Sequence, residues 1–397
     1  MKKYLIVLCL IALFISGCLR IETGDDPIHT VLRPPSPVPA KESTELPQAE
    51  TEEEAVQPET TEPDAKITIS AVGDIIGSTE NYQSVKTGDV YEFSGQFREL
   101  REMFLSHDLT IANLVSPIAG ADYGYSGYPR YNAPRELVQA IADIGIDALS
   151  TANRYAFDLG ARAVNSNLNN IQEIGLRAFG TAANQEQADQ PLILDVGGIK
   201  VGLASYTSLL NQPLGNVSYA VSMADPQTIE QDITKLRSQG AEIISVNMYW
   251  GDEYADHPNA EQTELMDLLE RLGVDIVLGS HPHVIQPLVV KTIEFEGRQK
   301  TMVQAYSLGN FYSAFLMGRT KTGLMLAIDV AREAGLTSIT DVRHKLVYNH
   351  QVERGDGQID YRLIDLDTVE ERRNDVLYNE MKSERDRAEE ILRSLDE

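Results

Sequence analysis

The stretch VLGSHPHVIQP, Val277 to Pro287, places His281 and His283 on either side of a proline. The chain holds only seven histidines in 397 residues, so two of them at one turn mark a candidate site. The apolar run Asp275 to Leu278 just before them is predicted as a strand. Neutral imidazole is a common ligand of zinc and iron. The stretch therefore suggests metal binding at a strand end, with the remaining ligands supplied from elsewhere in the chain.

Other predicted strands also end in polar or glycine-bearing turns. ITISAVGDIIGS, Ile67 to Ser78, is an apolar strand that runs into a glycine and then Asp74. Later strands end at Asn113, at Asn153 and at the pair Trp250-Gly251. Because ligands of open α/β sheets gather where strands end, these turns are candidates for the rest of the site.

The apolar periodicity predicts strands that alternate with helices. The predicted strands are Leu109–Ala112, Ala148–Ser150, Ile243–Tyr249, Asp275–Leu278, Thr301–Tyr306 and Thr322–Val330, with a hairpin of Leu192–Val196 and Lys200–Tyr206. The predicted helices are Phe97–Leu105, Pro134–Ile144, Val164–Ile174, Asp225–Gly240 and Glu261–Gly273. This alternation is typical of an α/β domain with a largely buried sheet, which is the fold class we predict.

Residues 1–18, MKKYLIVLCLIALFISGC, predict a lipoprotein signal peptide. Two lysines precede an apolar run that is short for a membrane span, and small residues directly precede Cys18, which resembles a bacterial lipobox. Cys18 would then carry the lipid, whereas Cys9 would be removed with the signal peptide. An uncleaved anchor and an ordinary signal peptide are the alternatives. A mature chain without cysteine would have no disulfides and no thiolate metal sites.

Two further segments differ in composition from the predicted domain. Residues 19–65 are rich in proline, glutamate and threonine, which predicts a disordered tether; a binding tail is the alternative. Residues 367–397 are charged with a weak apolar stripe, which predicts a peripheral helix, with partner binding as the alternative. The formal net charge of -26 argues against nucleic-acid binding, because that function needs basic patches.

Five sequence blocks resemble the bacterial capsule-synthesis CapA family, also called the poly-γ-glutamate synthesis family. They are AVGDIIGS, ANLVSPIAG, STANRYAFDLG, NMYWGDEY with VLGSHPHVIQP, and YSLGNFYS. The resemblance covers residues 66–366. It places the chain in the calcineurin-like metallophosphatase superfamily and implies a single α/β domain, a sandwich of two mixed β-sheets flanked by helices.

The resemblance also implies a centre of two divalent cations that clamp a phosphate-like group and activate a water. Of the implied ligands, this chain keeps Asp74, His281 and His283. Two histidines and one carboxylate can hold one cation with open positions. A single manganese, zinc or iron ion is therefore one hypothesis, with Glu253 and His257 as further ligands. The alternative is that the histidines are only hydrogen-bonded and that Asp74 caps nearby amides.

Other positions implied by the resemblance lack their ligands. Val115 stands in place of a bridging glutamate, Arg154 in place of an asparagine and Tyr249 in place of a histidine. Tyr155 replaces a proton-donating histidine, and a phenol titrates at about pH 10. A working two-metal centre is therefore not expected, and Arg154, Tyr155 and Tyr249 remain only weak catalytic candidates.

Arg154 suggests a more specific hypothesis. Its fixed positive charge could occupy the vacated cation position and pair with Asp74 or with an anionic ligand. The alternative is that its side chain turns out to solvent. We expect the inward arrangement, because Val115 and Tyr249 change together with Arg154.

A ligand groove is predicted beside these positions. The loop DYGYSGYPRYNAP is rich in glycine and tyrosine, which suits sugar or peptide contact; packing on its own domain is the alternative. Asn310 in YSLGNFYS is predicted to orient a site residue or to serve a structural turn. The groove residues are predicted to be Asn113, Asn153, Trp250, Asn310, Tyr128 and Arg130.

Taken with the signal peptide, the resemblance implies a lipid-anchored protein on the extracytoplasmic face of the bacterial cell membrane. The implied role is capsule or poly-γ-glutamate biosynthesis, with phosphoesterase activity reduced or absent. The expected partners are the membrane, a cell-surface polymer and polymer-synthesis membrane proteins, and no nucleic acid. The alternatives are an active single-metal hydrolase and a surface binding or scaffold protein unrelated to capsule.

Overall fold

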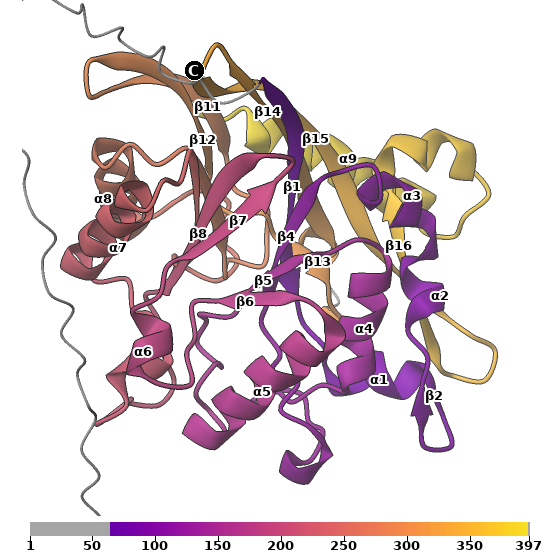
Figure 1. Cartoon of the computed structure of the whole chain (residues 1–397). Helices are drawn as coiled ribbons and strands as arrows, with labels where there is room; N and C mark the ends of the chain where they lie inside the picture. The colour runs from indigo at the N-terminus through magenta and orange to yellow at the C-terminus, as the bar shows by residue number, and fades with distance from the viewer. Residues whose placement is uncertain (1–63, 316, 396–397) are drawn as a thin grey trace, which may run out of the picture. The chain divides into compact units, whose positions relative to one another are not determined.

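The computed structural model describes residues 64–315 and 317–395, which belong to one compact unit (Figure 1). The predicted signal peptide, Cys18 and nearly all of the predicted tether lie outside the described residues. No helix within the described part of the chain is long and apolar enough to cross a membrane.

The first sheet has eight strands in the order β16-β15-β14-β1-β4-β5-β6, with β13 paired to β1. Its strands are β1 (Ala65–Ile75), β4 (Leu109–Leu114), β5 (Ala148–Ser150), β6 (Arg177–Phe179), β13 (Asn310–Tyr312), β14 (Thr322–Glu333), β15 (Leu336–Glu353) and β16 (Ile359–Asp365). The strands β1, β4, β5 and β6 are parallel, whereas β14, β15 and β16 add an antiparallel half. The first sheet is therefore mixed.

The second sheet has six strands in the order β11-β12-β10-β9-β8-β7. They are β7 (Leu192–Val196), β8 (Ile199–Thr207), β9 (Ile243–Tyr249), β10 (Ile276–Ser280), β11 (Leu288–Phe295) and β12 (Arg298–Ala305). The inner strands β8, β9, β10 and β12 are parallel, and hairpins close both edges. The second sheet is therefore also mixed.

The two sheets face each other across one hydrophobic core. Ile69 and Ile111 of the first sheet share this core with Val201, Ile243 and Ile276 of the second. Alternate side chains of a strand point to opposite faces, so the other face of each sheet needs its own cover. The predicted α/β sandwich of two mixed sheets is confirmed by this arrangement.

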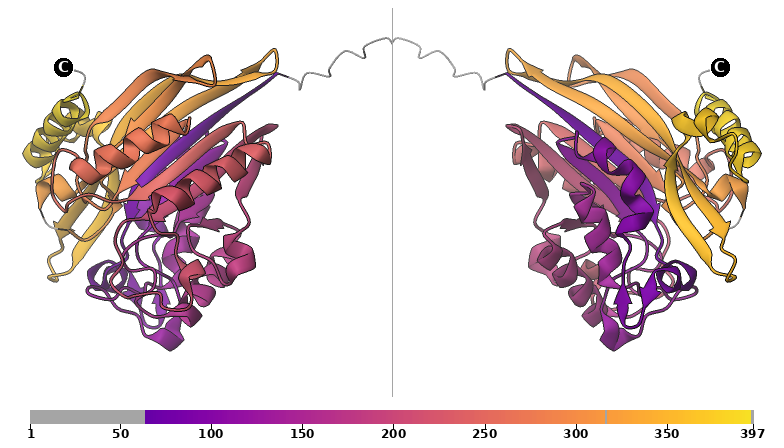
Figure 2. Two further views of the ribbon diagram at one scale, coloured as in Figure 1. Left: turned by 90° about the vertical axis from the view of Figure 1, so that its left-hand side faces the viewer. Right: turned by 90° about the vertical axis from the view of Figure 1, so that its right-hand side faces the viewer.

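Helices cover the outer face of each sheet (Figure 2). Helices α7 (Pro226–Ser238) and α8 (Ala260–Arg271) pack on the second sheet, where Ile233 and Leu269 join Val246 of β9. Helices α4 (Arg135–Asp143) and α5 (Ala161–Ile174) pack on the first sheet, where Leu137 joins Leu149 of β5. These helices bury the outer faces of the central strands, whereas parts of β11 and β15 stay exposed.

The short elements lie mostly around the first sheet. They are α1 (Thr79–Ser84), β2 (Lys86–Thr87), β3 (Val90–Tyr91), α2 (Ser94–Phe97), η1 (Arg98–Leu100), α3 (Arg101–Phe104), η2 (Ala121–Tyr123), α6 (Gln185–Ala188), η3 (Ser218–Ala220) and η4 (Gly318–Thr320). The single helix predicted over Phe97–Leu105 is wrong, because that stretch is divided among α2, η1 and α3. The apolar residues of this stretch still pack in the core, since Phe97 and Phe104 are buried.

The C-terminal segment folds as η5 (Leu366–Arg372) and α9 (Tyr378–Leu392). The apolar stripe of α9 is buried, and Met381, Ala388 and Leu392 belong to the same core that joins the two sheets. Tyr348 of β15 donates a hydrogen bond to Glu380 at 2.6 Å, which adds a polar contact. The helix is therefore an integral part of the folded unit.

Candidate functional site

Asp74 lies at the centre of the candidate site, near the end of β1 and fully buried. Strands β4 and β13 run parallel to β1, and the register sets Asn113 and Asn310 beside Asp74. Asn113 donates a hydrogen bond from Nδ2 to Asp74 Oδ1 at 2.7 Å. The ends of β1 and β4 and the start of β13 therefore bring these three residues together. Figure 1 shows the three strands beside one another.

A close backbone approach allows β13 to reach this position. A Cβ on Gly73 would lie 1.9 Å from the carbonyl oxygen of Gly309, so only glycine fits at position 73. The backbone N–H of Asp74 donates to the same carbonyl at 2.9 Å. The YSLGNFYS turn is thus held directly against the carboxylate.

The two histidines follow β10 in left-handed backbone, with φ of 95° at His281 and 61° at His283. Such φ values are uncommon outside glycine and are often found at functional sites. They bring the His281 backbone N–H to 3.3 Å from Asp74 Oδ2, and His283 Nδ1 to 3.7 Å from the same oxygen. The predicted grouping of Asp74 with both histidines is present in the structure.

The imidazole of His281 is held in one tautomer by backbone carbonyls. Its Nδ1 lies 3.2 Å from the Trp250 oxygen and 3.1 Å from the Gly251 oxygen. Because both neighbours can only accept, Nδ1 carries the proton and Nε2 keeps a lone pair. That Nε2 is buried without a hydrogen-bond partner in the described chain, 3.6 Å from Glu253 Oε1. Trp250 therefore contributes its backbone carbonyl, which accepts a hydrogen bond from His281, to the site.

His283 is oriented by Asn310, as the YSLGNFYS block predicts. Asn310 donates its Nδ2 to the Thr320 carbonyl at 2.9 Å, which fixes its Oδ1 as the acceptor for His283 Nδ1 at 3.0 Å. Burial lowers the pKa of His283, although the nearby Asp74 charge opposes the shift. His283 is thus a neutral imidazole at pH 7, with Nε2 as an acceptor.

Burial also shifts the other two central groups. It raises the pKa of Asp74, while His283 and the hydrogen bond from Asn113 act in the opposite direction. It lowers the pKa of His281, and the positive charge of Arg154 lowers it further. Neutral imidazoles beside a carboxylate are the protonation states that cation binding requires.

The described residues, 64–315 and 317–395, nevertheless contain no group of three His, Cys, Asp or Glu side chains arranged to hold a metal ion. Asp74 is already engaged by Asn113 and by the His281 backbone. The imidazole of His281, by contrast, donates its Nδ1–H to backbone carbonyls, as a metal-binding imidazole usually does. The two-cation centre does not fit these residues, and single-cation binding stays a hypothesis.

The half of the site that lacks ligands is filled by apolar and aromatic packing. Val115, Tyr155 and Tyr249 are buried and form a cluster with Ile76 and Tyr131. The rings of Tyr131 and Tyr155 meet edge to face, with centroids 4.8 Å apart. Burial raises the pKa of Tyr155 to about 12, so its hydroxyl stays protonated at neutral pH. This packing offers a cation no ligand set.

Arg154 does not pair with Asp74. Its Nη1 lies 2.6 Å from Glu253 Oε1, and its side chain is 28% exposed. The hypothesis of an Arg154–Asp74 pair is therefore wrong, because Asp74 is enclosed by its own donors while Glu253 lies nearer to solvent. The guanidinium also lies 5.9 Å from the centroid of the Tyr155 ring, which leaves Arg154 at the edge of the site.

Glu253 and His257, the two further ligand candidates, differ in their position relative to the site. Glu253 lies at the edge of the site between Arg154 and His281. His257 has an exposed side chain and contributes its backbone carbonyl to Gln286 Nε2 at 3.1 Å. Among the described residues, no contact joins the His257 side chain to the site, so the proposed ligand role of His257 is not supported.

A pocket of about 500 Å³ opens beside His283. We call it the tyrosine pocket; its lining residues are Ser78, Thr79, Glu80, Gly127, Tyr128, Tyr131, Tyr155, Glu253, Tyr254, His283, Ala314, Phe315 and Met317. Of the predicted groove residues only Tyr128 lines it. Asn113, Asn153, Trp250 and Asn310 are buried behind it, and Arg130 is exposed outside it. The predicted groove is thus corrected to a pocket built largely from other residues.

Sequence reasoning missed several of these residues. Tyr254, Phe315 and Glu80 come from three separate segments that carry no periodic pattern. Tyr254 is the last residue of the NMYWGDEY block, and Phe315 lies two residues after the YSLGNFYS block, which is the signal that could have found them. Asn153 instead shapes its own turn, where its Oδ1 accepts from the Tyr155 backbone N–H at 3.0 Å.

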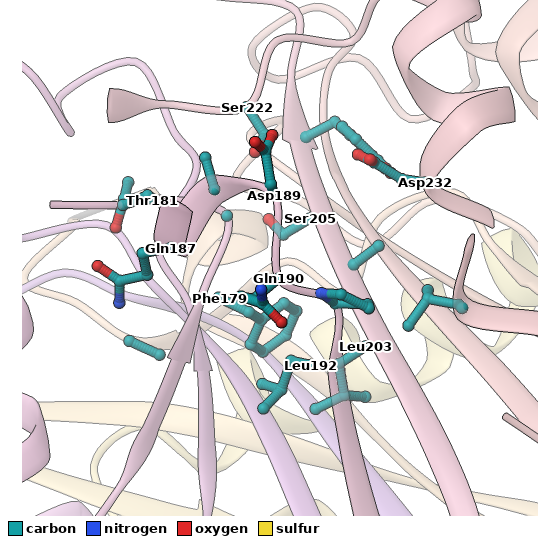
Figure 3. Close-up of a pocket in the computed structure, with 18 of the residues that line it drawn as sticks. Phe179, Thr181, Gln187, Asp189, Gln190, Leu192, Leu203, Ser205, Ser222 and Asp232 are labelled. Atoms are coloured by element: carbon teal, nitrogen blue, oxygen red, sulfur yellow. The ribbon is translucent and has the colours of Figure 1, made fainter. Parts of the chain in front are cut away.

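A second cavity of about 240 Å³ lies away from these residues (Figure 3). It is lined by β6, β8, α6 and α7, with Ser205, Ser222 and Asp232 among its polar groups. Tyr206 donates its hydroxyl to Asp232 Oδ2 at 3.0 Å, so the carboxylate is already engaged. The cavity shares no lining residue with the tyrosine pocket.

The family profile described as bacterial capsule synthesis protein PGA_cap matches residues 68–314, which is more than half of the chain. The chain belongs to this family. The matched region begins within β1 and ends just after β13, so it contains Asp74, both histidines and Asn310.

Two curated relatives carry related names. The capsule biosynthesis protein CapA of Bacillus anthracis is 26% identical over 304 residues, which cover 73% of this chain and 69% of that protein. The PGA biosynthesis protein CapA of Bacillus subtilis (strain 168) is 26% identical over 231 residues, which cover 57% of this chain and 58% of that protein. The chain therefore spans little more than half of the second relative.

Solved structures show a more distant likeness. The calcineurin-like phosphoesterase YfkN from Bacillus subtilis is 16% identical, with a TM-score of 0.43 over 72% of this chain and 91% of that one. The NAD nucleotidase NadN of Haemophilus influenzae is 11% identical, with a TM-score of 0.43 over 82% of this chain and 68% of that one.

Proposed function

We propose that this chain acts in capsule or poly-γ-glutamate biosynthesis as a binding or assembly protein, with phosphoesterase activity reduced or absent. In this proposal the chain lies on the extracytoplasmic face of the cell membrane, held by lipid on Cys18, and the lipobox-like sequence that ends at Cys18 supports this part of the proposal. Its partners would be a cell-surface polymer and the membrane proteins that make it. Membership of the family and the names of the two relatives support the role in capsule synthesis.

The buried cluster around Val115, Tyr155 and Tyr249 is the observation that supports reduced or absent phosphoesterase activity. A two-metal centre needs ligands on both sides of the attacked phosphate. Here one side is closed by a methyl-bearing side chain and phenol rings, while the other keeps Asp74 and the two histidines. Binding can use such a half-site, whereas a two-cation displacement cannot.

One observation favours a second candidate, a hydrolase with a single cation. His281 Nε2 is a buried lone pair without a partner in the described chain, while its Nδ1 donates to backbone carbonyls. That arrangement is common for imidazoles that bind metals. In this candidate His281, His283 and Asp74 would hold the ion, which would supply Lewis-acid chemistry.

Metal analysis of the purified full-length chain separates the two candidates. The protein is incubated with manganese or zinc, dialysed, and tested for bound metal and for hydrolysis of phosphate esters. We expect no stoichiometric metal and no hydrolysis above background. His281→Asn is the site variant, because asparagine tolerates positive φ, and His257→Asn is the matched control.

Each result decides between the candidates. Stoichiometric metal and hydrolysis that both disappear in His281→Asn but survive in His257→Asn would overturn the binding proposal in favour of the hydrolase. A capsule role is tested separately by measuring surface polymer in a strain that lacks the gene. Unchanged polymer in that strain would instead favour a surface scaffold unrelated to capsule.

A further inference from the structure

We propose that the tyrosine pocket binds a primary ammonium group, carried on an amine-bearing unit of its ligand. This inference names the ligand class for the same site and rests on the proposed binding role. Three features of the pocket support it: its hydrogen-bonding groups, its aromatic rings and the pairing of its nearby cation.

The charged and imidazole groups that line the pocket act as acceptors. Glu80 is exposed and has no ion pair or hydrogen bond with its side chain in the described chain. Glu253 contributes a second carboxylate. His283 Nδ1 donates to Asn310, which leaves Nε2 as an acceptor. A ligand with several N–H donors and a positive charge complements this set.

Aromatic rings supply the second requirement. Tyr128, Tyr131, Tyr155, Tyr254 and Phe315 all line the pocket. Tyr128 is 78% exposed, an unusually open position for so large a ring. The faces of aromatic rings attract cations, and aromatic cages recognise organic ammonium groups by this effect. Rings and carboxylates together therefore favour a cation over a neutral or anionic ligand.

Arg154 already shows the same combination within the chain. Its guanidinium contacts Glu253 at 2.6 Å and lies 5.9 Å from the Tyr155 ring centroid, so one tethered cation uses a carboxylate and a ring at the pocket edge. Glu80, which no cation of the described residues engages, is left for a ligand. No lysine or arginine lines the pocket.

This charge arrangement disfavours polyanions at the pocket. A carboxylate-rich polymer would meet Glu80 and Glu253 without an unpaired cation to offset them, in a chain whose net charge is -26. The inferred ligand therefore differs from an acidic polymer backbone.

The pocket is also held in shape before a ligand arrives. The backbone of Tyr254, at φ 66°, donates to the Pro282 carbonyl at 2.8 Å. The Phe315 ring lies 4.6 Å from His283. Ser126 and Asn132 exchange two backbone hydrogen bonds, of 3.0 and 2.9 Å, at the base of the loop that carries Tyr128. Such preorganisation reduces the entropy lost on binding.

Calorimetry with matched ligands tests the inference on the full-length, chelator-treated chain. Glucosamine carries a primary ammonium, N-acetylglucosamine has the same ring without the charge, and N-acetylglutamate is an anion without an amine. We expect glucosamine to bind, N-acetylglucosamine to bind about tenfold more weakly, and N-acetylglutamate not to bind.

Two variants locate the binding. Glu80→Gln removes the unpaired carboxylate and Tyr128→Ala removes the most exposed ring, and each should weaken glucosamine binding about tenfold. The matched controls are Glu264→Gln, an exposed glutamate of α8, and Tyr123→Ala, from the same tyrosine-rich loop but outside the pocket. Both controls should bind like the parent chain.

Equal binding of glucosamine and N-acetylglucosamine, preference for N-acetylglutamate, no binding of glucosamine, or unchanged binding in both pocket variants would each overturn the inference. Metal content is measured on an untreated portion of each preparation. Absent amine binding in a chain that holds no metal counts against this inference alone, whereas stoichiometric metal together with hydrolysis of phosphate esters counts against the proposed function.

Discussion

At the scale of one residue, the hydroxyl of Tyr249 tests whether the altered site contains a buried polar group without a partner. It is buried, and no described residue gives it a hydrogen bond. A buried polar group without a partner costs about 1–3 kcal/mol. Tyr249→Phe should therefore raise the free energy of unfolding by about 1 kcal/mol or more, as measured by denaturant titration of the full-length chain.

Tyr312→Phe is the matched control, because the Tyr312 hydroxyl is equally buried but donates to Gln96. Its loss should leave an unsatisfied amide oxygen and lower the free energy of unfolding. If Tyr249→Phe is destabilising to the same degree, the Tyr249 hydroxyl has a bound partner in solution and the site is less reduced than proposed.

The central residues of the site could be predicted from the sequence because they follow strand ends. Asp74 lies near the end of β1 in the first sheet, and His281 and His283 follow β10 in the second, so the ends of these strands meet where the two sheets face each other. The partner of Arg154 could not be predicted. It depends on how Asn113 and the His281 backbone already satisfy Asp74, which only tertiary packing determines.

At the scale of elements, α9 provides a test of how the C-terminal segment contributes to the fold. Met381 is fully buried in the core that joins both sheets. Removing a large buried side chain costs about 2–5 kcal/mol, so Met381→Ala should lower the free energy of unfolding by that amount. Denaturant titration of the full-length chain measures the change.

Val376→Ala is the control from the same segment. Val376 is 82% exposed just before α9, so its truncation should change stability by less than about 0.5 kcal/mol. Similar small effects for both variants would mean that α9 contributes little to stability and is only a peripheral helix, which is what its weak apolar stripe predicts.

Elements with a clear apolar pattern could be predicted, whereas β15, a strand rich in charged residues, could not. Strand β9 matches its predicted range, and α5 begins three residues before its predicted start. The sequence pattern predicts no strand over Leu336–Glu353, the range of β15, which carries several charged residues. Arg343 pairs with Asp329 of β14 at 2.6 Å, and Lys345 pairs with Asp365 of β16 at 2.7 Å. These cross-strand ion pairs explain why a strand can carry so many charges. The partners come from distant parts of the sequence, so they are known only once the sheet is assembled.

At the scale of the whole molecule, the proposal depends on where the folded unit is held. In this proposal, lipid on Cys18 attaches the folded unit to the membrane. Each buried methylene of an acyl chain contributes about 0.8 kcal/mol, and stable anchoring needs more than one chain or a second signal.

Cys18→Ser should therefore move the chain from the membrane fraction to the soluble fraction of cells, as measured by fractionation and immunoblotting. Cys9→Ser is the matched control, because Cys9 lies inside the apolar run that the predicted cleavage removes. It should leave the chain in the membrane fraction. If Cys18→Ser stays with the membrane as firmly as Cys9→Ser, the N-terminal run is itself the anchor. The pocket would then be held at the membrane by protein rather than by lipid.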